Sequence, residues 1–502
     1  MPNIEPICPK FDLKVLDGDE LAAIKSATLH ILEHAGIHFP SERALRVFAE
    51  HGAEVDTETQ IVKMSPDLVL EAMGRAPRTY TLSGRADGTD LLLDGSASYF
   101  STDGCGVRTV DFETGEQRAS CKDDVARMAR VADYLSSIAF YWPVVSAQDH
   151  GWAAPLHEID ASFNNTVKHV QTETVMGEAP ARYAVRMAEV IAGSREKLRA
   201  QPPLSLMVCT IAPLGQDKEG IEGAMVFAEA GIPVGFMAMP NMGATAPATT
   251  GGALAMASAE VVSAMVLMQL VAPGASTFYS IVASVMDPRT AEYLNAIAAK
   301  YLCHVAGVQI AHDWGVPILG GAFGAHSAEP ATWQQGRDSV YNGLMVPLAG
   351  ADIVVGMGLV RASTLLVPEQ IIFDDEIYHT HRVLAEGLDT SGDGLALDVI
   401  ETVGPRGHFL AQEHTRRHMR EIWIPGLTHP SAQRPLRSPL RTGPRPAFDG
   451  KPQPDIRQRA KAKVDKILAE HQPEPLEQAA QAELRAILDA AERELGEQVV
   501  NI

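Results

Sequence analysis

The fold is decided by residues 204–239, which read LSLMVCTIAPLGQDKEGIEGAMVFAEAGIPVGFMAM. Two short apolar runs, Leu204–Ile211 and Val234–Met239, flank the segment Glu219–Ala230, whose apolar residues recur at helical spacing. A strand, a helix and a second strand in this order predict two parallel strands joined by a crossover helix. The stretch therefore predicts one unit of an α/β protein with a parallel sheet.

The same alternation of short apolar runs and helical segments continues from about residue 90 onward. The eight predicted strands are Ala97–Thr102, Ile138–Val145, Thr166–Thr172, Leu204–Ile211, Val234–Met239, Thr277–Ala283, Pro317–Phe323 and Asp352–Met357. The helices predicted between them are Asp123–Leu135, Pro180–Ile191, Glu219–Ala230, Gly252–Leu270 and Ala291–His304. Eight repeats predict closure into a (β/α)8 TIM barrel, and an open doubly wound sheet is the alternative.

The segments on either side of the barrel differ from it in composition. We predict an N-terminal helical region at 1–89, the barrel at 90–424, a Pro/Arg-rich linker at 425–455 and C-terminal helices at 456–502. In the first region Asp19–His34 is amphipathic, and Ser65 followed by Pro66 is a typical helix start. The linker cannot hold a helix or a central strand because prolines interrupt it throughout.

Composition excludes several classes of protein. The 502 residues include 42 Lys+Arg and 63 Asp+Glu, a formal net charge of −21 that repels nucleic-acid backbones. None of the five cysteines forms a CxxC pair, so neither a disulfide framework nor a cysteine zinc site is predicted. The N-terminus has no signal-peptide pattern, and the apolar stretch Gly251–Pro273 contains Glu260, which favours a buried core helix over a membrane span. We expect a cytoplasmic protein without membrane or nucleic-acid partners.

Common catalytic motifs give little guidance to the site. GxxxxGK[ST], GxSxG and HExxH are absent from the sequence. The nearest pattern, Glu413-His414 with His418, we interpret as a solvated helix face, because two arginines lie within it. The acidic run 374–376, which precedes His379 and His381, we interpret as a surface charge cluster.

The ends of the barrel strands give a better candidate site, because catalytic groups of such barrels lie there. The acids Asp103 and Glu173 follow two of the predicted strands, and Gln171 precedes Glu173. Aromatic residues near strand ends are Tyr99, Trp142, Trp152, Tyr279, Phe323 and Trp333. Aromatic faces next to a carboxylate suit an organic cation. Core packing is the alternative interpretation of each aromatic residue.

Four segments carry a resemblance to a known family. They are GATAPATTGGALAMASAEVV (243–262) with LMQLVAPGA (267–275), DFETGEQR (111–118), Gly320-Gly321 through Gly350-Ala351-Asp352, and EIWIP (421–425). The chain resembles the trimethylamine / glycine-betaine methyltransferase family over roughly residues 10–430. These are corrinoid-dependent TIM-barrel enzymes. The resemblance implies a methyltransferase that moves a methyl group from a methylated amine to the cobalt of cobalamin, a corrinoid carried by a separate partner protein.

One departure from the family bears on the substrate. Trimethylamine enzymes of methanogens carry pyrrolysine in the loop after the seventh strand, whereas residues 323–332 here are all standard, with Ser327, Ala328 and Glu329 at the corresponding place. The chain is therefore similar to the non-pyrrolysine branch of the family. A quaternary nitrogen is already positive and departs as a neutral amine. The resemblance thus implies a quaternary amine substrate, with glycine betaine first.

The predicted substrate-binding residues follow from the strand ends and from this resemblance. Asp103 and Glu173 would face the ammonium, and His326 or backbone N–H groups of 321–324 would bind a carboxylate. The full set is Asp103, Glu173, Tyr279, Phe323, His326, Tyr99 and Gln171. No metal ligand is predicted, no catalytic residue is assigned, and we expect a homo-oligomer.

Two alternatives remain open from the sequence. The first is a non-catalytic betaine-binding barrel that has lost its partner. The second is a metal-assisted lyase or hydrolase on the same fold, with Asp103, Glu173 and His150 as ligands.

Overall fold

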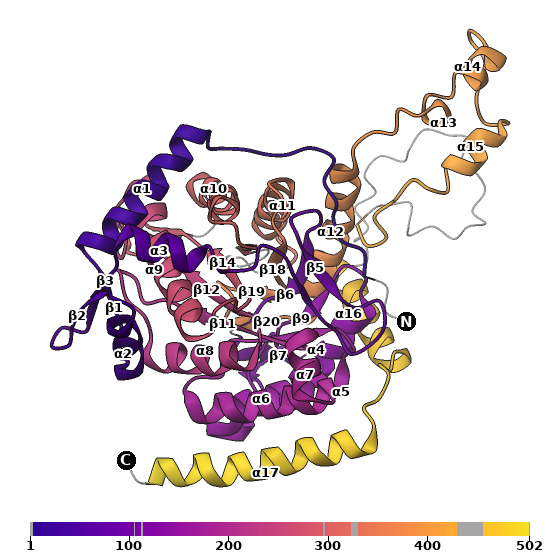
Figure 1. Ribbon diagram of the computed structural model, residues 1–502. Coiled ribbons are helices and arrows are strands. Elements are labelled where there is room, and N and C mark those ends of the chain that lie inside the picture. Colours follow the sequence, from indigo (N-terminus) through magenta and orange to yellow (C-terminus); the bar gives the residue numbers. More distant parts are fainter. Residues whose placement is uncertain are drawn as a thin grey trace.

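The computed structural model describes residues 4–104, 106–111, 114–294, 297–322, 330–428 and 455–500, with the side chains of 322 and 497–500 left out. Eight parallel strands form its centre (Figure 1). They are β6 (Tyr99–Thr102), β9 (Phe140–Tyr141), β10 (His169–Thr172), β11 (Leu204–Cys209), β12 (Val234–Ala238), β14 (Thr277–Ile281), β17 (Leu319–Ala322) and β18 (Ile353–Met357). Each lies within one of the eight predicted runs, so the strand prediction is confirmed.

Hydrogen bonding closes the sheet into a barrel. The strand order is β14-β12-β11-β10-β9-β6-β18-β17, and the two ends of this order meet where Tyr279 of β14 pairs in parallel with Ile318, just before β17. The Tyr279 N–H donates to the Pro317 carbonyl at 2.9 Å. A closed ring has no edge strand, so the open doubly wound alternative is wrong and the (β/α)8 barrel is confirmed.

Side chains on successive strand residues alternate between the barrel interior and the surrounding helices. Phe140, Met207, Met237 and Phe278 belong to one buried cluster inside the ring. Their neighbours along the strands pack instead with the helices in the larger core. This alternation determines which strand-end residues can reach the mouth of the barrel.

Among the described residues, eight helices surround the ring, one after each strand. They are α4 (Lys122–Tyr134), α5 (Ala154–Asn165), α6 (Glu178–Ala192), α8 (Lys218–Ala230), α9 (Thr250–Val271), α10 (Ala298–Trp314), α11 (Trp333–Leu348) and α12 (Gln370–Glu386). The short α7 (Arg195–Ala200) follows α6. The helix predicted at Ala291–His304 is displaced, because β16 (Tyr293–Leu294) takes its first residues and α10 begins only at Ala298.

Local signals in residues 204–239 explain why one helix forms between two strands. Asp217 accepts a hydrogen bond from the Gly220 N–H at 2.7 Å and so caps α8 at its start. Gly231 ends the helix in the left-handed conformation at φ +85°, which residues with a side chain rarely adopt. Val234 then begins β12.

The N-terminal region covers one side of the barrel. Its helices are α1 (Gly18–His34), α2 (Glu42–Glu50) and α3 (Pro66–Met73), and α1 and α3 pack on α9. Asp17 and Glu20 form a capping box on α1, and Ser65 caps α3 as predicted. Two small sheets were not predicted. One contains β1 (Ile37–His38), β2 (Glu54–Asp56) and β3 (Ile61–Lys63), and the other pairs β4 (Tyr80–Leu82) with β5 (Leu91–Leu93).

Helix α9 is the one helix in the described part of the chain that is long and apolar enough to cross a membrane. Inside the protein 94% of its apolar window is buried. Glu260, at its centre, accepts hydrogen bonds from the Thr210 hydroxyl at 2.6 Å and the Leu214 N–H at 2.8 Å. The prediction of a buried core helix is confirmed.

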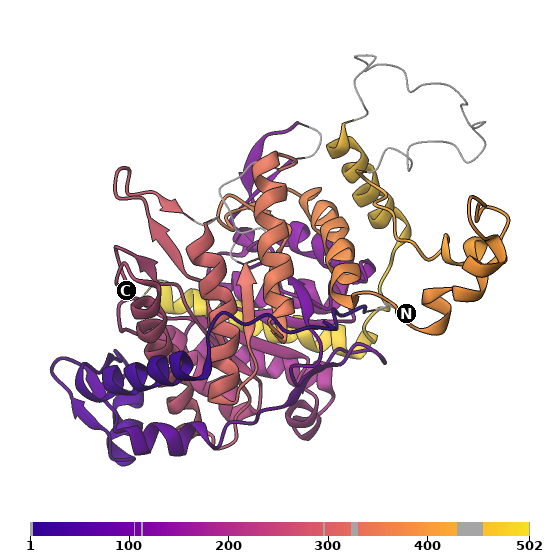
Figure 2. The same ribbon diagram turned by 90° about the horizontal axis from the view of Figure 1, so that it is seen from above.

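The chain leaves the barrel after α12. Three short helices follow, α13 (Gly392–Leu395), α14 (Leu397–Val403) and α15 (Glu413–His418), and they stand away from the barrel in both views (Figures 1 and 2). Helices α16 (Ile456–Glu470) and α17 (Gln478–Val500) return to it, α16 against α4 and α12, and α17 against α5 and α6. Most of the predicted linker, residues 429–454, lies outside the described residues.

Gly235 provides a test of packing inside the ring. A Cβ at this position would lie 2.1 Å from the nearest ring atom of Phe278 on the neighbouring strand. We expect Gly235→Ala to lower the free energy of unfolding by about 1–3 kcal/mol, measured by urea titration, because close-packed interiors resist added atoms. As a control, Gly251→Ala on α9 meets no atom within 4 Å and should be neutral or mildly stabilising. Equal effects of the two substitutions would contradict this packing.

Candidate functional site

The mouth of the barrel is the end at which the parallel strands finish. Two small sheets rim it. One has the order β19-β20-β7-β8, and its strands are β19 (Leu359–Val360), β20 (Leu365–Leu366), β7 (Arg108–Val110) and β8 (Gln117–Ala119). The other joins β13 (Asn241–Met242), β15 (Ser284–Met286) and β16. Loops at this end carry the chemistry in (β/α)8 barrels.

Trp142 and Glu173 lie together at the ends of β9 and β10. Both line a cavity of about 150 Å³, together with Gly106, Val107, Pro143, Val145, Ser146, Glu158, Thr172 and Thr174. A cavity of about this size can hold a ligand as large as benzene. An indole ring and a carboxylate around such a space are suited to a small organic cation.

Gly104 allows the indole to lie where it does. A Cβ on Gly104 would come within 2.3 Å of Trp142 Nε1. Asp103, Gly104, Trp142 and Glu173 therefore form a continuous group at the ends of three neighbouring strands, β6, β9 and β10.

Glu158 of α5 forms a second wall of the cavity and is buried. Its carboxylate accepts hydrogen bonds from the Ser146 hydroxyl at 2.7 Å, the Ala147 N–H at 3.1 Å and the Thr174 hydroxyl at 2.5 Å. Burial raises its pKa, and these donors act in the opposite direction. Three donors fix the carboxylate firmly, so Glu158 holds the strand ends in place.

Asp103 is buried at the end of β6. The Ser363 hydroxyl and the Gly104 N–H both donate to its carboxylate, the latter at 3.0 Å. Burial raises the pKa of Asp103 to about 6, although both donors and the charge of Lys300 favour the ionised form. Ser363 ends a run of three left-handed residues, with φ of 54°, 54° and 64° at 361–363. Such backbone is costly without glycine and clusters at functional sites.

Lys300 brings a buried positive charge toward the same acid. It lies on the first turn of α10 and is fully buried. Burial lowers its pKa to about 7, while the charges of Asp103 and Asp338 partly oppose that shift. Each of the two buried groups therefore favours the charged form of the other, against the effect of burial.

Two buried hydrogen-bond donors near the mouth have no acceptor among the described residues. Within the described residues, Trp142 Nε1 and Gln171 Nε2 are buried and have no hydrogen-bond partner. The Gln171 Oε1 accepts only a long hydrogen bond, 3.4 Å, from the Ser205 hydroxyl. A buried donor without an acceptor costs about 1–3 kcal/mol, so such groups point to a bound polar atom.

The structure distributes the predicted site residues unevenly. Asp103, Glu173 and Gln171 share the inward-facing side of their strands. Tyr99, as the first residue of β6, lies at the opposite end of the barrel from the mouth. Tyr279 is buried near Ser258 and Glu260 of α9, on the helix side of the sheet. These positions do not support a substrate contact by either tyrosine. Phe323 and His326 lie outside the described residues.

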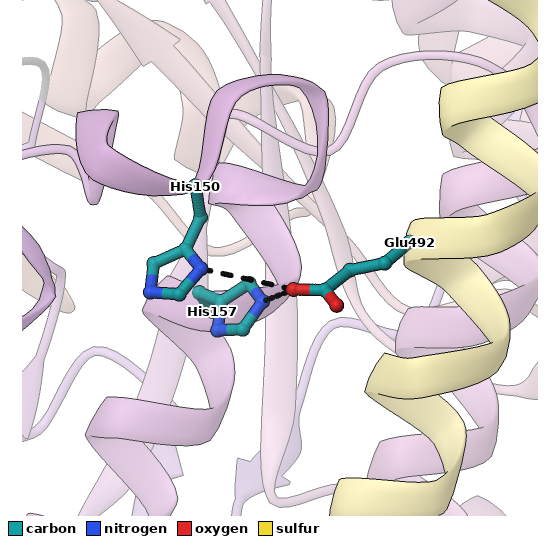
Figure 3. Close-up of side chains that lie close together, drawn as sticks. All are labelled: His150, His157 and Glu492. Atoms are coloured by element: carbon teal, nitrogen blue, oxygen red, sulfur yellow. Dashed lines mark hydrogen bonds and ion pairs between the residues drawn. The ribbon is translucent and has the colours of Figure 1, made fainter.

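The metal-site alternative required Asp103, Glu173 and His150 to converge. Among the described residues, His150 instead groups with His157 and Glu492, and Figure 3 shows both imidazoles directed at the Glu492 carboxylate of α17. The two rings stack with centroids 3.5 Å apart. His157 Nε2 lies 2.8 Å from Glu492 Oε1. The predicted trio is therefore not a common site.

Hydrogen bonding opposes a metal ion in this His150–His157–Glu492 cluster. Lys122 Nζ lies 2.9 Å from His157 Nδ1 and 2.6 Å from Asp160. A lysine can only donate, so Nδ1 accepts, and Nε2 carries the proton that it donates to Glu492. Burial lowers the pKa of His157, and the charge of Lys122 adds to that shift. The cluster therefore joins α17 to the barrel through a neutral His157.

A second group with metal-ligand spacing contains Asp393, His414 and His418. Arg417 Nη2 binds both oxygens of Asp393 and lies 3.1 Å from His418 Nε2, so a guanidinium already takes the cationic position. These residues are exposed or half-buried on α13 and α15, as predicted for a solvated helix face.

The prediction of a surface charge cluster at 374–376 with His379 and His381 is wrong for three of these residues. Asp374, Asp375 and His381 are buried on α12. Burial raises the pKa of Asp374 to about 8, whereas hydrogen bonds and charges of His379 and Lys463 outweigh burial and lower that of Asp375 to about 2. Because α12 packs between the barrel and α16, an apolar pattern alone could not reveal which of its acids face inward.

Sequence reasoning missed Ser363, Lys300 and Glu158. Ser363 lies in a loop with no motif, and Lys300 and Glu158 are charged helix residues that no motif marks. Trp142 was recognised as an aromatic near a strand end but was not selected. Its signal was available, because Trp142 lies two residues after Phe140 and so has the same inward orientation.

Barrel and mouth together define a (β/α)8-barrel enzyme. A model of the trimethylamine methyltransferase family (MTTB) matches residues 1–496, and the chain belongs to this family. It is a methyltransferase.

Several named proteins are similar to the chain. A trimethylamine methyltransferase MttB of Desulfitobacterium hafniense is 31% identical over 489 residues, 97% of this chain and 95% of that protein. A glycine betaine methyltransferase from another strain of that species is 28% identical over 498 residues, 98% and 99% of the two chains. The monomethylamine methyltransferase structure of Methanosarcina barkeri aligns at 11% identity and a TM-score of 0.44, over 98% of this chain and 96% of that one.

Ser363 offers a test of the Asp103 environment. Its hydroxyl stabilises the ionised carboxylate, so Ser363→Ala should raise the pKa of Asp103 above about 6. The measurement is a carbon-detected NMR titration of the carboxyl groups, with the Asp103 signal assigned by its loss in Asp103→Asn. An Asp103 pKa unchanged by Ser363→Ala would contradict the assigned hydrogen bond.

His157 predicts a pH dependence of stability. Its pKa is lowered in the folded protein, so below about pH 6.5 the unfolded chain takes up a proton that the folded chain resists. Stability present above pH 6.5 is therefore lost as the pH falls toward the folded value. We expect His157→Gln to reduce the slope of unfolding free energy between pH 7 and 5 by up to about 1.4 kcal/mol per pH unit.

The matched control is His34→Gln, at the exposed end of α1. It should leave the wild-type slope unchanged. Equal slopes in the wild type and His157→Gln would show that His157 is not held neutral.

Proposed function

We propose that the protein transfers a methyl group from a quaternary amine, glycine betaine first, to the Co(I) centre of a separate corrinoid protein. Family membership supports methyl transfer. The observation that carries the substrate class is the cavity of about 150 Å³ that Trp142 and Glu173 line together. A quaternary ammonium is attracted by both groups and needs no proton donor.

The depth of the polar groups supports a betaine in one orientation. Gln171 lies two residues below Glu173 on the same inward face of β10, roughly 6–7 Å deeper. Its Nε2 has no partner among the described residues and is suited to a carboxylate. Gln171 does not itself line the cavity, so a betaine in this orientation would extend from Glu173 into the barrel interior, with its carboxylate at Gln171 and its N-methyl groups facing the mouth.

The transfer needs little acid–base chemistry from the chain. The corrinoid protein, as second substrate, supplies the electron pair that forms the carbon–cobalt bond, while the carbon–nitrogen pair stays on nitrogen and leaves dimethylglycine neutral at that atom. The chain's task is to orient the methyl group, and orientation can contribute up to roughly 7–11 kcal/mol. The aromatic wall favours the cation before charge leaves nitrogen, so it serves binding more than rate.

The standard residues at 323–332 support the quaternary amine over trimethylamine. A tertiary amine leaves poorly until its nitrogen has a fourth bond, whereas a quaternary nitrogen already has it. The names of the relatives do not decide between the two substrates, because both substrates occur among them at similar identity.

Binding variants test the cavity. Trp142→Leu should weaken glycine betaine binding, measured by calorimetry, by about 2–30-fold, since a cation–π contact contributes about 0.5–2 kcal/mol. Glu173→Gln should weaken it as well. The matched controls are Trp152→Leu, on an exposed tryptophan of the 3-10 helix Gln148–Ala153, and Glu189→Gln on the outer helix α6. Binding that survives both cavity substitutions would remove this cavity from the proposal.

Transfer is tested separately. The purified chain, a reduced corrinoid protein of this enzyme class and glycine betaine should give the absorption of methylated cobalt, and trimethylamine in its place should not. Methylation with trimethylamine alone would overturn the substrate assignment.

A further inference from the structure

Residues 388–424, which we call the arm, form a structured excursion from the barrel. The arm contains α13, α14 and α15, and none of the residues of these helices is buried. Figures 1 and 2 both show it standing clear of the barrel helices. Its return is fixed by Glu376 of α12, whose carboxylate accepts from the backbone N–H groups of Leu427 and Thr428.

Polar contacts within the arm converge on one residue. The carboxylate of Asp393 pairs with Arg417 and His418, and Arg417 Nη2 lies 2.7 Å from Oδ2. The backbone oxygen of Asp393 lies 2.9 Å from His414 Nε2. Exposed ion pairs of this kind contribute about 0–1 kcal/mol each. They set the shape of the arm but cannot replace a hydrophobic core.

The arm nevertheless exposes many large apolar side chains. Their exposed fractions are Leu388 80%, Leu395 50%, Leu397 60%, Ile400 50%, Phe409 44%, Leu410 87%, Met419 57%, Ile422 55% and Ile424 48%. Monomeric proteins rarely expose contiguous apolar surface beyond a few hundred Å². A segment of this size with no buried helix residue needs a partner surface to be stable.

The point where the arm departs favours a partner other than the corrinoid protein, whereas the returning residues Pro425 and Thr428 lie beside Trp333 at the start of α11. The arm begins directly after α12, where Ala385 accepts a hydrogen bond from the Lys10 N–H at 2.9 Å. Nearby, Ile7 pairs with Ser98, which immediately precedes the first residue of β6. The arm therefore leaves from the end where strands begin, opposite the mouth at which a methyl acceptor must bind.

The charges of the arm are segregated along its sequence. Residues 389–401 hold four acids and no base, whereas residues 406–420 hold four arginines, three histidines and a single acid, Glu413. Within the described residues, Asp398, Glu401, Arg406 and Arg420 have no ion-pair partner of their own. Two arms in antiparallel contact would place each acidic half against the basic half of the other.

We propose that the arm pairs with the arm of a second copy of this chain about a two-fold axis. Apolar residues of α14 form the centre of the contact, and the opposite charges fix its direction. The contact is self-complementary, as two-fold interfaces must be. A standard interface buries about 800 Å² per partner, which a face of three helices with their connections can supply.

Sedimentation velocity on the full chain at low micromolar concentration tests the pairing. The wild type should sediment as a dimer or a larger even assembly. Leu397→Asp with Ile400→Asp should halve the mass of the particle while leaving the unfolding of the barrel unchanged. Leu70→Asp, at an exposed leucine of α3, is the control and should leave the mass unaltered.

Charge reversal tests the antiparallel direction. Asp398→Arg with Glu401→Arg should weaken assembly by at least tenfold in dissociation constant. Adding Arg406→Glu and Arg420→Glu to the same chain should restore it. A monomeric wild type, or an assembly insensitive to the α14 substitutions, would overturn the pairing and assign the arm to a different protein. If the variant with all four charge reversals does not assemble again, the antiparallel contact is overturned.

Discussion

Closure of the sheet between Tyr279 and Ile318 is the constraint on which the remaining structure depends. Once the ring is closed, every parallel strand finishes at the same end, and every second side chain must face inward. Asp103, Trp142 and Glu173 come together only because three adjacent strands obey both conditions. The ring thus fixes the position of Asp103. The loop at 361–363 and the buried Lys300 then act on the carboxylate at that position.

The barrel was predictable from sequence because its strands are buried on both faces and read as short apolar runs. The strands β1–β3, by contrast, have only two or three residues each, too few to show a period. The selection of Tyr99 was an avoidable error. Tyr99 precedes Thr102 in a correctly predicted strand, so the rule that the site lies at the carboxyl ends of the strands already excluded it.

The candidate site was predictable only in part, for reasons of orientation and depth. Asp103 and Glu173 follow strands, so their place could be inferred, whereas the outward direction of Tyr279 depends on its pairing with β12 and with Ile318. Lys300 and Asp374 lie in helices whose charged residues are normally solvated. Their burial arises from contacts between segments far apart in the sequence, which the sequence pattern does not contain.

The buried carboxyl group of Asp103 has a consequence for calorimetry. With a pKa of about 6 it is partly protonated in mildly acidic solution. An arriving ammonium would favour its ionised form, and the displaced proton would pass to the buffer. The heat of ligand uptake would then vary with the ionisation enthalpy of the buffer chosen, and a comparison of phosphate with an amine buffer would count the protons released.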